Sequence, residues 1–353
     1  MPVPLQNIYY LLCYAWNRLE VRNLVDVDSL PGNRVENLLG TVLNEGVSDL
    51  IRRGLDRGYV PVEEEGRRLR GKLLVAETVN RLLLRRGRVA CRTDELSYDV
   101  PHNRVVKAAL RHLIDLPSLD DELRTTLRSH WLRLRDVNDV SLSPATFRKV
   151  QLHQNVARYA FLINISRLIA RSLLPDQKTG GQRFYPFTAS EQEMGRLFEG
   201  FVRNFLRREQ DRYTVSAQKV RWQVDPDWGS DTSWLPEMRT DILLQDTSRR
   251  ILFETKYYAT PHQEHLGRRK LISGHLYQLL TYLAHMSADD GPEPVGVLLY
   301  ADVGRVPQLN YRLGGFTLLV RSLNLNQGWH VIHRDLLRLV NELSQAAQDK
   351  VSA

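Results

Sequence analysis

Hydrophobic residues recur at every third or fourth position over long stretches of the first half of this 353-residue chain, and this spacing predicts helices. The helical stretches are residues 5–19, 34–53 and 104–174, the last with a break at 137–144. Alternation of apolar and polar residues predicts strands at residues 58–62 and 69–75. We therefore expect a first region that mixes helices and strands and becomes helical towards its end.

A polar, glycine-rich segment at residues 175–182 separates this region from the rest of the chain. The elements predicted after it are a helix at 190–206, strands at 240–244 and 251–256, a helix at 271–286, strands at 295–300 and 316–320, and a closing helix at 334–347. That order is typical of a small α/β domain with a mixed sheet. We predict an α/β fold class, with an N-terminal region of residues 1–175 and a second domain of residues 183–353.

Two of these strands, which are adjacent in the sequence, carry three charged residues. Alternation places Glu254 and Lys256 on one face of the second strand. If the polar turn closes an antiparallel hairpin centred between residues 247 and 248, Asp241 lies directly opposite Glu254. The Cβ atoms of directly opposed residues are roughly 4.5–5.5 Å apart. The pattern therefore predicts two neighbouring carboxylates with an ammonium group beside them.

Two carboxylates at this distance repel each other unless a cation lies between them. Hard oxygen ligands with room for water or phosphate indicate Mg²⁺ or Mn²⁺ rather than zinc. Lys256 would orient or help deprotonate an attacking water and stabilise the charge that grows on a phosphate. The alternative interpretation is a solvated hairpin end, because short apolar runs that end in charged residues are common.

The predicted helices on either side supply three further candidates. Ser190 and Glu193 form a capping box at the start of the first helix, and Glu199 lies beside its apolar stripe. In the later helix, Gln278 and Tyr282 are four residues apart and share one face. The alternative for all three is ordinary helix surface.

Taken together, these pieces resemble the restriction-endonuclease-like core of the PD-(D/E)xK superfamily, in its RecB-like branch. They follow that order along the chain, with a helix bearing Glu199, a strand bearing Asp241, a strand bearing Glu254 and Lys256, and a helix bearing Gln278 and Tyr282. The superfamily's usual proline before the aspartate is replaced by Thr240, which is not a ligand position. The resemblance implies that Asp241 and Glu254 hold the metal, and both a one-metal and a two-metal mechanism remain open.

The resemblance also implies roles for the other candidates. Lys256 would assist the attacking water, and Glu199 would position a second ion or the first ion's water. Gln278 and Tyr282 would support substrate placement.

Motifs in the N-terminal half narrow the family. The aromatic opening at residues 7–16, the segment 94–96 and the segment 103–107 resemble those of the McrC family, the nuclease subunits of McrBC restriction systems. The resemblance runs along nearly the whole chain. It implies that the chain cuts DNA only together with a separate McrB-like AAA+ GTPase ring, which recognises modified cytosine in double-stranded DNA. It further implies that the N-terminal half docks on this ring and stimulates its hydrolysis.

Composition agrees with a polyanionic partner. The chain has 49 Lys and Arg against 41 Asp and Glu, a net charge of +8, and its basic residues cluster at 67–72, 81–88 and 268–270. Two cysteines make neither a disulfide framework nor a zinc site. No stretch approaches 18 apolar residues and the start lacks a basic signal region, so we expect a cytoplasmic protein.

A P-loop-like match at residues 66–73 ends in Leu73, where a Ser or Thr would be needed to hold a nucleotide's Mg²⁺, so we expect no nucleotide hydrolysis by this chain. The leading hypothesis is a Mg²⁺-dependent DNA endonuclease subunit. Two alternatives stay open. One is a non-catalytic DNA-binding activator of the GTPase, and the other is a stand-alone RecB-like exonuclease.

Overall fold

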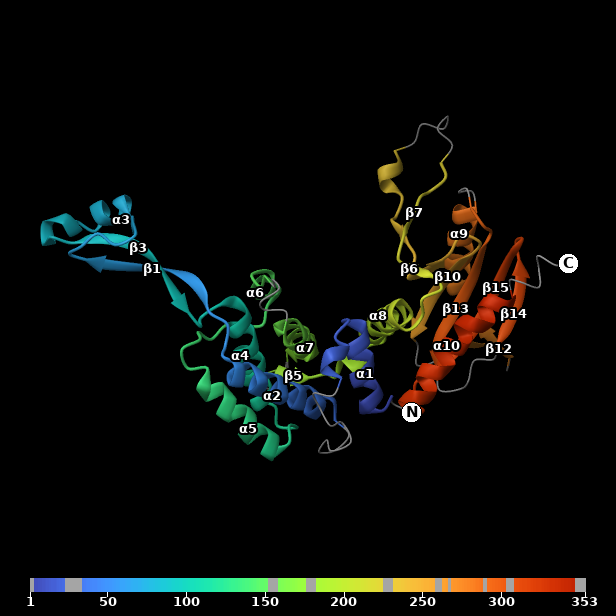
Figure 1. Ribbon diagram of the computed structural model, residues 1–353, viewed down its shortest axis with the longest axis horizontal. Coiled ribbons are helices and arrows are strands. Elements are labelled where there is room, and N and C mark those ends of the chain that lie inside the picture. The colour runs from blue at the N-terminus through green and yellow to red at the C-terminus, as the bar shows by residue number, and fades with distance from the viewer. Residues whose placement is uncertain are drawn as a thin grey trace. The chain divides into compact units, whose positions relative to one another are not determined.

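The computed structural model groups the chain into two compact units, one of residues 1–29 with 186–353 and the other of residues 30–185. We call them the sheet unit and the helical unit and describe each by itself (Figure 1). The residues described are 3–22, 34–151, 158–175, 182–224, 231–257, 262–265, 268–287, 291–302 and 308–346.

The helical unit is built around four helices that pack on one another. They are α2 (Val35–Arg53), α4 (Pro101–Ile114), α5 (Asp121–Arg133) and α7 (Tyr159–Ser172), joined by the short α6 (Pro144–Arg148) and followed by the small β4 (Leu173–Pro175) and β5 (Gln182–Phe184) pair. Local sequence sets the starts of two of them. Pro101 occupies the first turn of α4, and the Asp120 side chain accepts bonds from the first backbone N–H groups of α5. Helical periodicity in this region is confirmed.

A β extension projects from these helices (Figure 1). It consists of β1 (Gly58–Gly66), β2 (Lys72–Leu73) and β3 (Val89–Ser97) in the order β1-β3-β2, with α3 (Val75–Asn80) and the 3₁₀ turn η3 (Leu83–Arg86) between β2 and β3. The strand predicted at residues 69–75 is wrong at both ends. Gly71 has a φ of +66°, which interrupts the extended run, and the Ala90 N–H donates to Thr78 Oγ1, which ties a helical turn to β3.

A six-stranded mixed sheet forms the centre of the sheet unit, in the order β14-β15-β13-β10-β9-β6. The strands are β6 (Thr214–Ser216), β9 (Ile242–Gln245), β10 (Arg250–Tyr257), β13 (Pro294–Asp302), β14 (Leu309–Leu313) and β15 (Phe316–Asn324). Strands β10, β13 and β15 run parallel, whereas β6, β9 and β14 pair antiparallel to their neighbours. The predicted α/β class with a mixed sheet is confirmed.

Helices cover both faces of this sheet. α9 (Ser273–Ser287) buries Leu279 and Leu283 against Leu252 and Leu298 on one face. On β10, Arg250 through Thr255 are all buried, so the opposite face is covered as well, and α8 (Glu191–Glu209) packs against β10 there. The closing helix α10 (Trp329–Ala346) packs on β15.

Two smaller strand pairs complete the sheet unit. They are β7 (Lys219–Val220) with β8 (Met238–Arg239), and β11 (His262–His265) with β12 (Arg268–Leu271), and the 3₁₀ turns are η1 (Leu19–Val21), η5 (Phe187–Ala189) and η7 (Thr232–Trp234). None of the helices in the described ranges combines the length and apolarity needed to cross a membrane.

The aromatic opening of the chain belongs to the sheet unit, which differs from the predicted division into residues 1–175 and 183–353. Helix α1 (Leu5–Ala15) lies along α8, where the Asn204 side chain donates to the carbonyls of Tyr14 and Ala15 at 3.1 and 2.9 Å. A Cβ atom on Gly200 would approach the Ala15 Cβ to 3.2 Å, so glycine permits the close approach of the two helices. Cys13 in this helix and Cys91 in β3 are both buried, and the structure has them as free cysteines.

Candidate active site

The β9–β10 hairpin has the predicted register. Ile242 pairs with Phe253 and Leu244 with Ile251, so the next position outward places Asp241 opposite Glu254. The turn is closed locally, because the Asp246 carboxylate accepts a 2.7 Å bond from the Ser248 N–H. The structure therefore brings together the two carboxylates that the sequence singles out.

Asp241 is fixed at the end of β9 by one residue of the neighbouring strand. Its Oδ2 atom accepts bonds from both the backbone N–H and the hydroxyl of Thr255, at 2.8 and 2.7 Å. The preceding Thr240 is buried, and its Oγ1 accepts a 3.0 Å bond from the Gln218 N–H. One carboxylate oxygen of Asp241 is thus used for structure.

Glu254 and Lys256 lie in contact on the same face of β10. The Lys256 ammonium donates to Glu254 Oε1 at 2.7 Å and to Gln278 Oε1 at 3.0 Å. Gln278 in turn donates from its Nε2 to the Tyr282 hydroxyl at 3.1 Å. The two predicted residues of α9 are therefore not ordinary helix surface but continue the hydrogen-bond chain that starts at Glu254.

The environment of Glu254 disfavours its charge. Only 2% of the residue is exposed, and Oε2 is a buried atom with no hydrogen-bond partner among the residues that the structure describes. Burial, and then the negative charge of Asp241, raise the Glu254 pKa to about 7, against the opposing effect of Lys256. A cation between Asp241 and Glu254 would supply the missing partner of Oε2 and relieve the repulsion.

Glu199 joins the same electrostatic group from α8. Burial, followed by the charge of Asp241, raises the Glu199 pKa, while the ion pair with Arg203 lowers it. The Arg203 guanidinium lies 2.6 Å from Glu199 Oε1 and 3.4 Å from the Asp241 carbonyl oxygen. Glu199 is thus close enough to Asp241 for their charges to interact, but its carboxylate already forms an ion pair with Arg203.

These donors fit Mg²⁺ better than a metal held by protein ligands alone. Across the described part of the chain, no three or more His, Cys, Asp or Glu side chains gather in a metal-holding arrangement. Mg²⁺ commonly keeps several waters and takes one or two carboxylates plus substrate phosphates. Asp241 and Glu254 would be the two residues that hold it.

Sequence reasoning missed four residues of this site. Thr255 alternates with Glu254 and Lys256 along β10 and so was not a candidate, and its bond to Asp241 uses a backbone N–H that no pattern reveals. Arg203 follows Glu199 by four residues, a spacing that signals a helical ion pair. His275 and Tyr300, hydrogen bonded beside Lys256, carried no sequence signal.

The basic segment at residues 268–270 forms part of β12. The Lys270 side chain is exposed, whereas the side chains of Arg268 and Arg269 fall outside the described part of the chain. Phosphate contacts by this segment stay a prediction.

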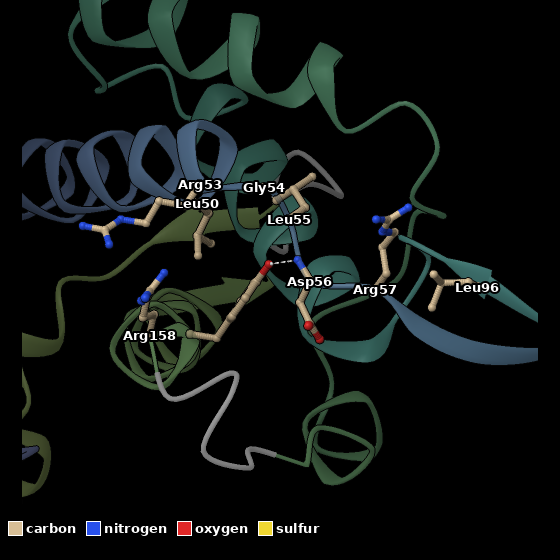
Figure 2. A pocket seen from close by; sticks show the side chains of 9 residues that line it. Leu50, Arg53, Gly54, Leu55, Asp56, Arg57, Leu96 and Arg158 are labelled. Carbon is tan, nitrogen blue, oxygen red and sulfur yellow. Dashed lines mark hydrogen bonds between the residues drawn. The ribbon is translucent and has the colours of Figure 1, made fainter.

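A cavity of about 350 Å³ opens in the helical unit, beside the end of α2. It is lined by Leu50, Arg53, Gly54, Leu55, Asp56, Arg57, Leu96, Arg158 and Tyr159. In Figure 2 the guanidinium groups of Arg53 and Arg158 extend to one side of Asp56, and that of Arg57 lies on the other. The Asp56 N–H donates to the Tyr159 hydroxyl at 3.1 Å, which fixes the lining loop.

Comparisons with known proteins agree along most of the chain. A family model described as "McrBC 5-methylcytosine restriction system component" matches residues 9–301. An *Escherichia coli* (strain K12) protein, "Type IV methyl-directed restriction enzyme EcoKMcrBC", is 32% identical over 340 residues, which are 96% of this chain and 98% of that protein. A solved assembly of *Thermococcus gammatolerans* McrB AAA+ hexamers with bound McrC is similar in fold, with a TM-score of 0.56 at 16% identity over 96% of this chain and 75% of that one.

Proposed function

The chain belongs to the family of McrBC 5-methylcytosine restriction system components, and from this premise we propose that it is the Mg²⁺-dependent DNA endonuclease subunit of such a system. The observation that carries the proposal is the buried Glu254, whose Oε2 has no hydrogen-bond partner among the described residues and whose pKa is raised by burial and then by the charge of Asp241. Paired carboxylates can hold a metal ion for phosphodiester hydrolysis, and a lysine beside them can assist the attacking water.

Asp241 and Glu254 would hold the ion, with Asp241 oriented by Thr255 and Glu254 by Lys256. When bound, the ion would polarise the scissile phosphate and lower the pKa of a water molecule. The Lys256 ammonium would hold the attacking water and stabilise the negative charge that develops on the phosphate. Its second bond, to Gln278, limits the directions in which it can point.

Glu199 and Tyr282 have supporting roles in this proposal. Tyr282 accepts from Gln278 and so stabilises the amide orientation that faces Lys256. Glu199 would position a second ion or a water after exchanging its bond with Arg203, and Arg203 would then be available to a DNA phosphate.

The proposed partner is a McrB-like AAA+ GTPase ring acting on DNA with modified cytosine. The *T. gammatolerans* assembly contains McrB AAA+ hexamers with McrC bound to them. In this chain, a group of exposed large apolar side chains supports the helical unit as the docking part. Among the described residues, eight of them lie on the β extension, at Tyr59, Leu69, Leu73, Val75, Val79, Leu82, Leu84 and Leu96. The arginine-lined cavity lies where this extension meets the helices.

A reconstituted cutting assay tests the proposal. The full chain is incubated with its matched GTPase, GTP, Mg²⁺ and cytosine-methylated plasmid, and wild type is compared with Asp241→Ala and Lys256→Ala. Asp246→Ala in the hairpin turn is the matched control, since Asp246 bonds only within its own turn in the contacts above. We expect the first two variants to stop cutting and the control to keep it.

Other outcomes would favour the alternatives. Undiminished cutting by Asp241→Ala or Lys256→Ala would reject the assigned site. GTPase stimulation without any metal-dependent cutting by wild type would favour a non-catalytic activator. Degradation of DNA ends by the isolated chain would favour a RecB-like exonuclease.

A further inference from the structure

A second polar bridge between α9 and the sheet lies next to the one made by Lys256. His275, in the first turn of α9, is 6% exposed, and its Nδ1 atom lies 2.9 Å from the hydroxyl oxygen of Tyr300 in β13. Tyr300 is fully buried. It is also the residue that pairs with Lys256 in the parallel register of β10 and β13.

The two bridges therefore join one helix to two adjacent strands at the same level of the sheet. Lys256 of β10 meets Gln278, and Tyr300 of β13 meets His275, which is three residues before Gln278 and on the same face of α9. Apolar side chains also pack here, since Leu279 and Leu283 of α9 belong to the same core cluster as Tyr300.

Burying the polar pair of His275 and Tyr300 in this core costs free energy, and apolar side chains could fill the same space without that cost. Buried hydroxyl and imidazole groups must keep a hydrogen bond to avoid a desolvation penalty, whereas apolar side chains would fill the same volume without that constraint. The hydrogen bond does add direction, because it fixes both the distance and the rotation of α9 relative to β13.

We propose that His275 is a positioning residue for Lys256. Through its bond with Tyr300 it fixes the first turn of α9, so that the Gln278 amide stays at the Lys256 ammonium. This inference rests on the proposed nuclease function, in which the direction of that ammonium matters for the attacking water. A misplacement of about 1 Å in such a group lowers a rate by roughly a hundredfold.

The charge state of His275 suits this role. Burial, and then the positive charge of Lys256, lower the His275 pKa to about 4, so the imidazole is neutral near neutral pH. A neutral group at this place orients α9 without adding a second cation that would repel the lysine.

Four variants of the full chain test the inference. Tyr300→Phe removes only the hydroxyl, and His275→Leu removes the imidazole. His275→Asn keeps an amide near the position of Nδ1 and cannot be charged. Tyr277→Phe is the matched control. It makes the same chemical change as Tyr300→Phe and lies on the same helix as His275, but at a residue that is 67% exposed.

The first readout does not depend on cutting. Acetylation of Lys256 by acetic anhydride is followed by mass spectrometry in the isolated chain, with the exposed Lys270 as internal reference. The Lys256 side chain is 14% exposed in the structure and should react slowly. We expect Tyr300→Phe and His275→Leu to speed its acetylation roughly tenfold, since both loosen α9 at Lys256. His275→Asn and Tyr277→Phe should resemble wild type.

The second readout is the cutting assay with the GTPase, in which kcat and KM for DNA are separated. Tyr300→Phe and His275→Leu should lower kcat by roughly tenfold to a hundredfold with little change in KM, and His275→Asn should restore it. Wild-type rates of acetylation and cutting in Tyr300→Phe and His275→Leu, with a lower Tm alone, would reduce the pair to core packing and overturn the inference. If wild type does not cut DNA at all, the proposed function fails, while the acetylation rates still decide whether His275 positions Lys256.

Discussion

Two strand pairs of this chain carry glutamates, and their surroundings differ completely. In the β extension, Glu63 of β1 is half exposed and pairs across the strands with Arg92 of β3 at 2.6 Å. In the sheet unit, Glu254 of β10 is 2% exposed and pairs with Lys256 at 2.7 Å. The distances are nearly equal, but burial, and then the charge of Asp241, raise the pKa of Glu254 to about 7.

The difference comes from what covers each strand. β1 alternates between half-buried and exposed positions along its length, so water screens its ion pairs and they contribute little. β10 is covered by helices on both faces, so the Coulomb interactions among Asp241, Glu254 and Lys256 act in a medium that screens them poorly. Burial, rather than residue type, separates a candidate catalytic strand from an ion-paired surface strand.

The sharpest way to break this comparison is the same substitution in both strands. Glu254→Gln removes a proposed metal ligand while keeping the shape of the side chain, and it should lower cutting by at least about a thousandfold. Glu63→Gln makes the identical change on the extension and should leave the rate of phosphodiester cleavage unchanged. Single-turnover cutting of methylated plasmid measures both, and equal losses in the two variants would refute the comparison.

Lys256 and Arg92, the cationic partners of Glu254 and Glu63, give a second contrast with a slightly smaller expected effect on cutting. Lys256→Met should lower the cutting rate by about two orders of magnitude, because the group that would assist the water is lost. Arg92→Met should change the free energy of unfolding by less than about 1 kcal/mol, as for other exposed pairs, and leave cutting intact. Chemical denaturation together with the cutting assay checks both variants.

The pH dependence of stability sharpens the comparison for the metal-free protein. The folded pKa of Glu254 lies above its ordinary value of 4.5, so the folded state binds more protons than the unfolded state between about pH 4.5 and 7. Stability from this group is therefore present below that window and is lost as the pH rises through about 7. In EDTA, wild type should lose on the order of 3 kcal/mol across the window relative to Glu254→Gln. A parallel pH dependence of Tm in the two proteins would contradict the assigned burial effect.

The smallest effect is expected for the apolar surface of the extension. Leu84→Ser changes a side chain that is 64% exposed, so the free energy of unfolding should move by less than about 0.5 kcal/mol. Affinity for the GTPase ring should fall by roughly tenfold if this surface is the docking part. Thermal unfolding and a GTPase titration measure the two effects. Unchanged affinity in Leu84→Ser together with Leu82→Ser would move the docking surface elsewhere.

The parts of the site that the sequence predicted are those governed by local periodicity. A polar turn of fixed length sets the hairpin register, so the opposition of Asp241 and Glu254 was predictable, and helical spacing placed Gln278 beside Tyr282. The bond from Thr255 to Asp241 was not predictable, because its donor is a backbone N–H, which every residue type except proline carries. The bond between His275 and Tyr300 joins elements whose alignment only the packed sheet determines.

The same distinction holds for the fold. The helices and the strands of the mixed sheet were predictable because each has its own apolar pattern within a single segment of the chain. The association of α1 with α8 depends on contacts such as Tyr14 with Glu209, residues almost two hundred positions apart, which no local pattern encodes. The strand predicted at residues 69–75 is too long, because Leu74 and Val75 suit both a strand and the helical turn that Thr78 stabilises.

Metal binding by the isolated full chain tests the central claim most directly. Mn²⁺ is titrated into wild type, Glu254→Gln and Glu63→Gln, and bound Mn²⁺ is followed by electron paramagnetic resonance with Mg²⁺ as competitor. The account predicts that wild type and Glu63→Gln bind Mn²⁺ in competition with Mg²⁺, and that Glu254→Gln does not. Equal binding by all three proteins would contradict a metal site built on the buried Glu254.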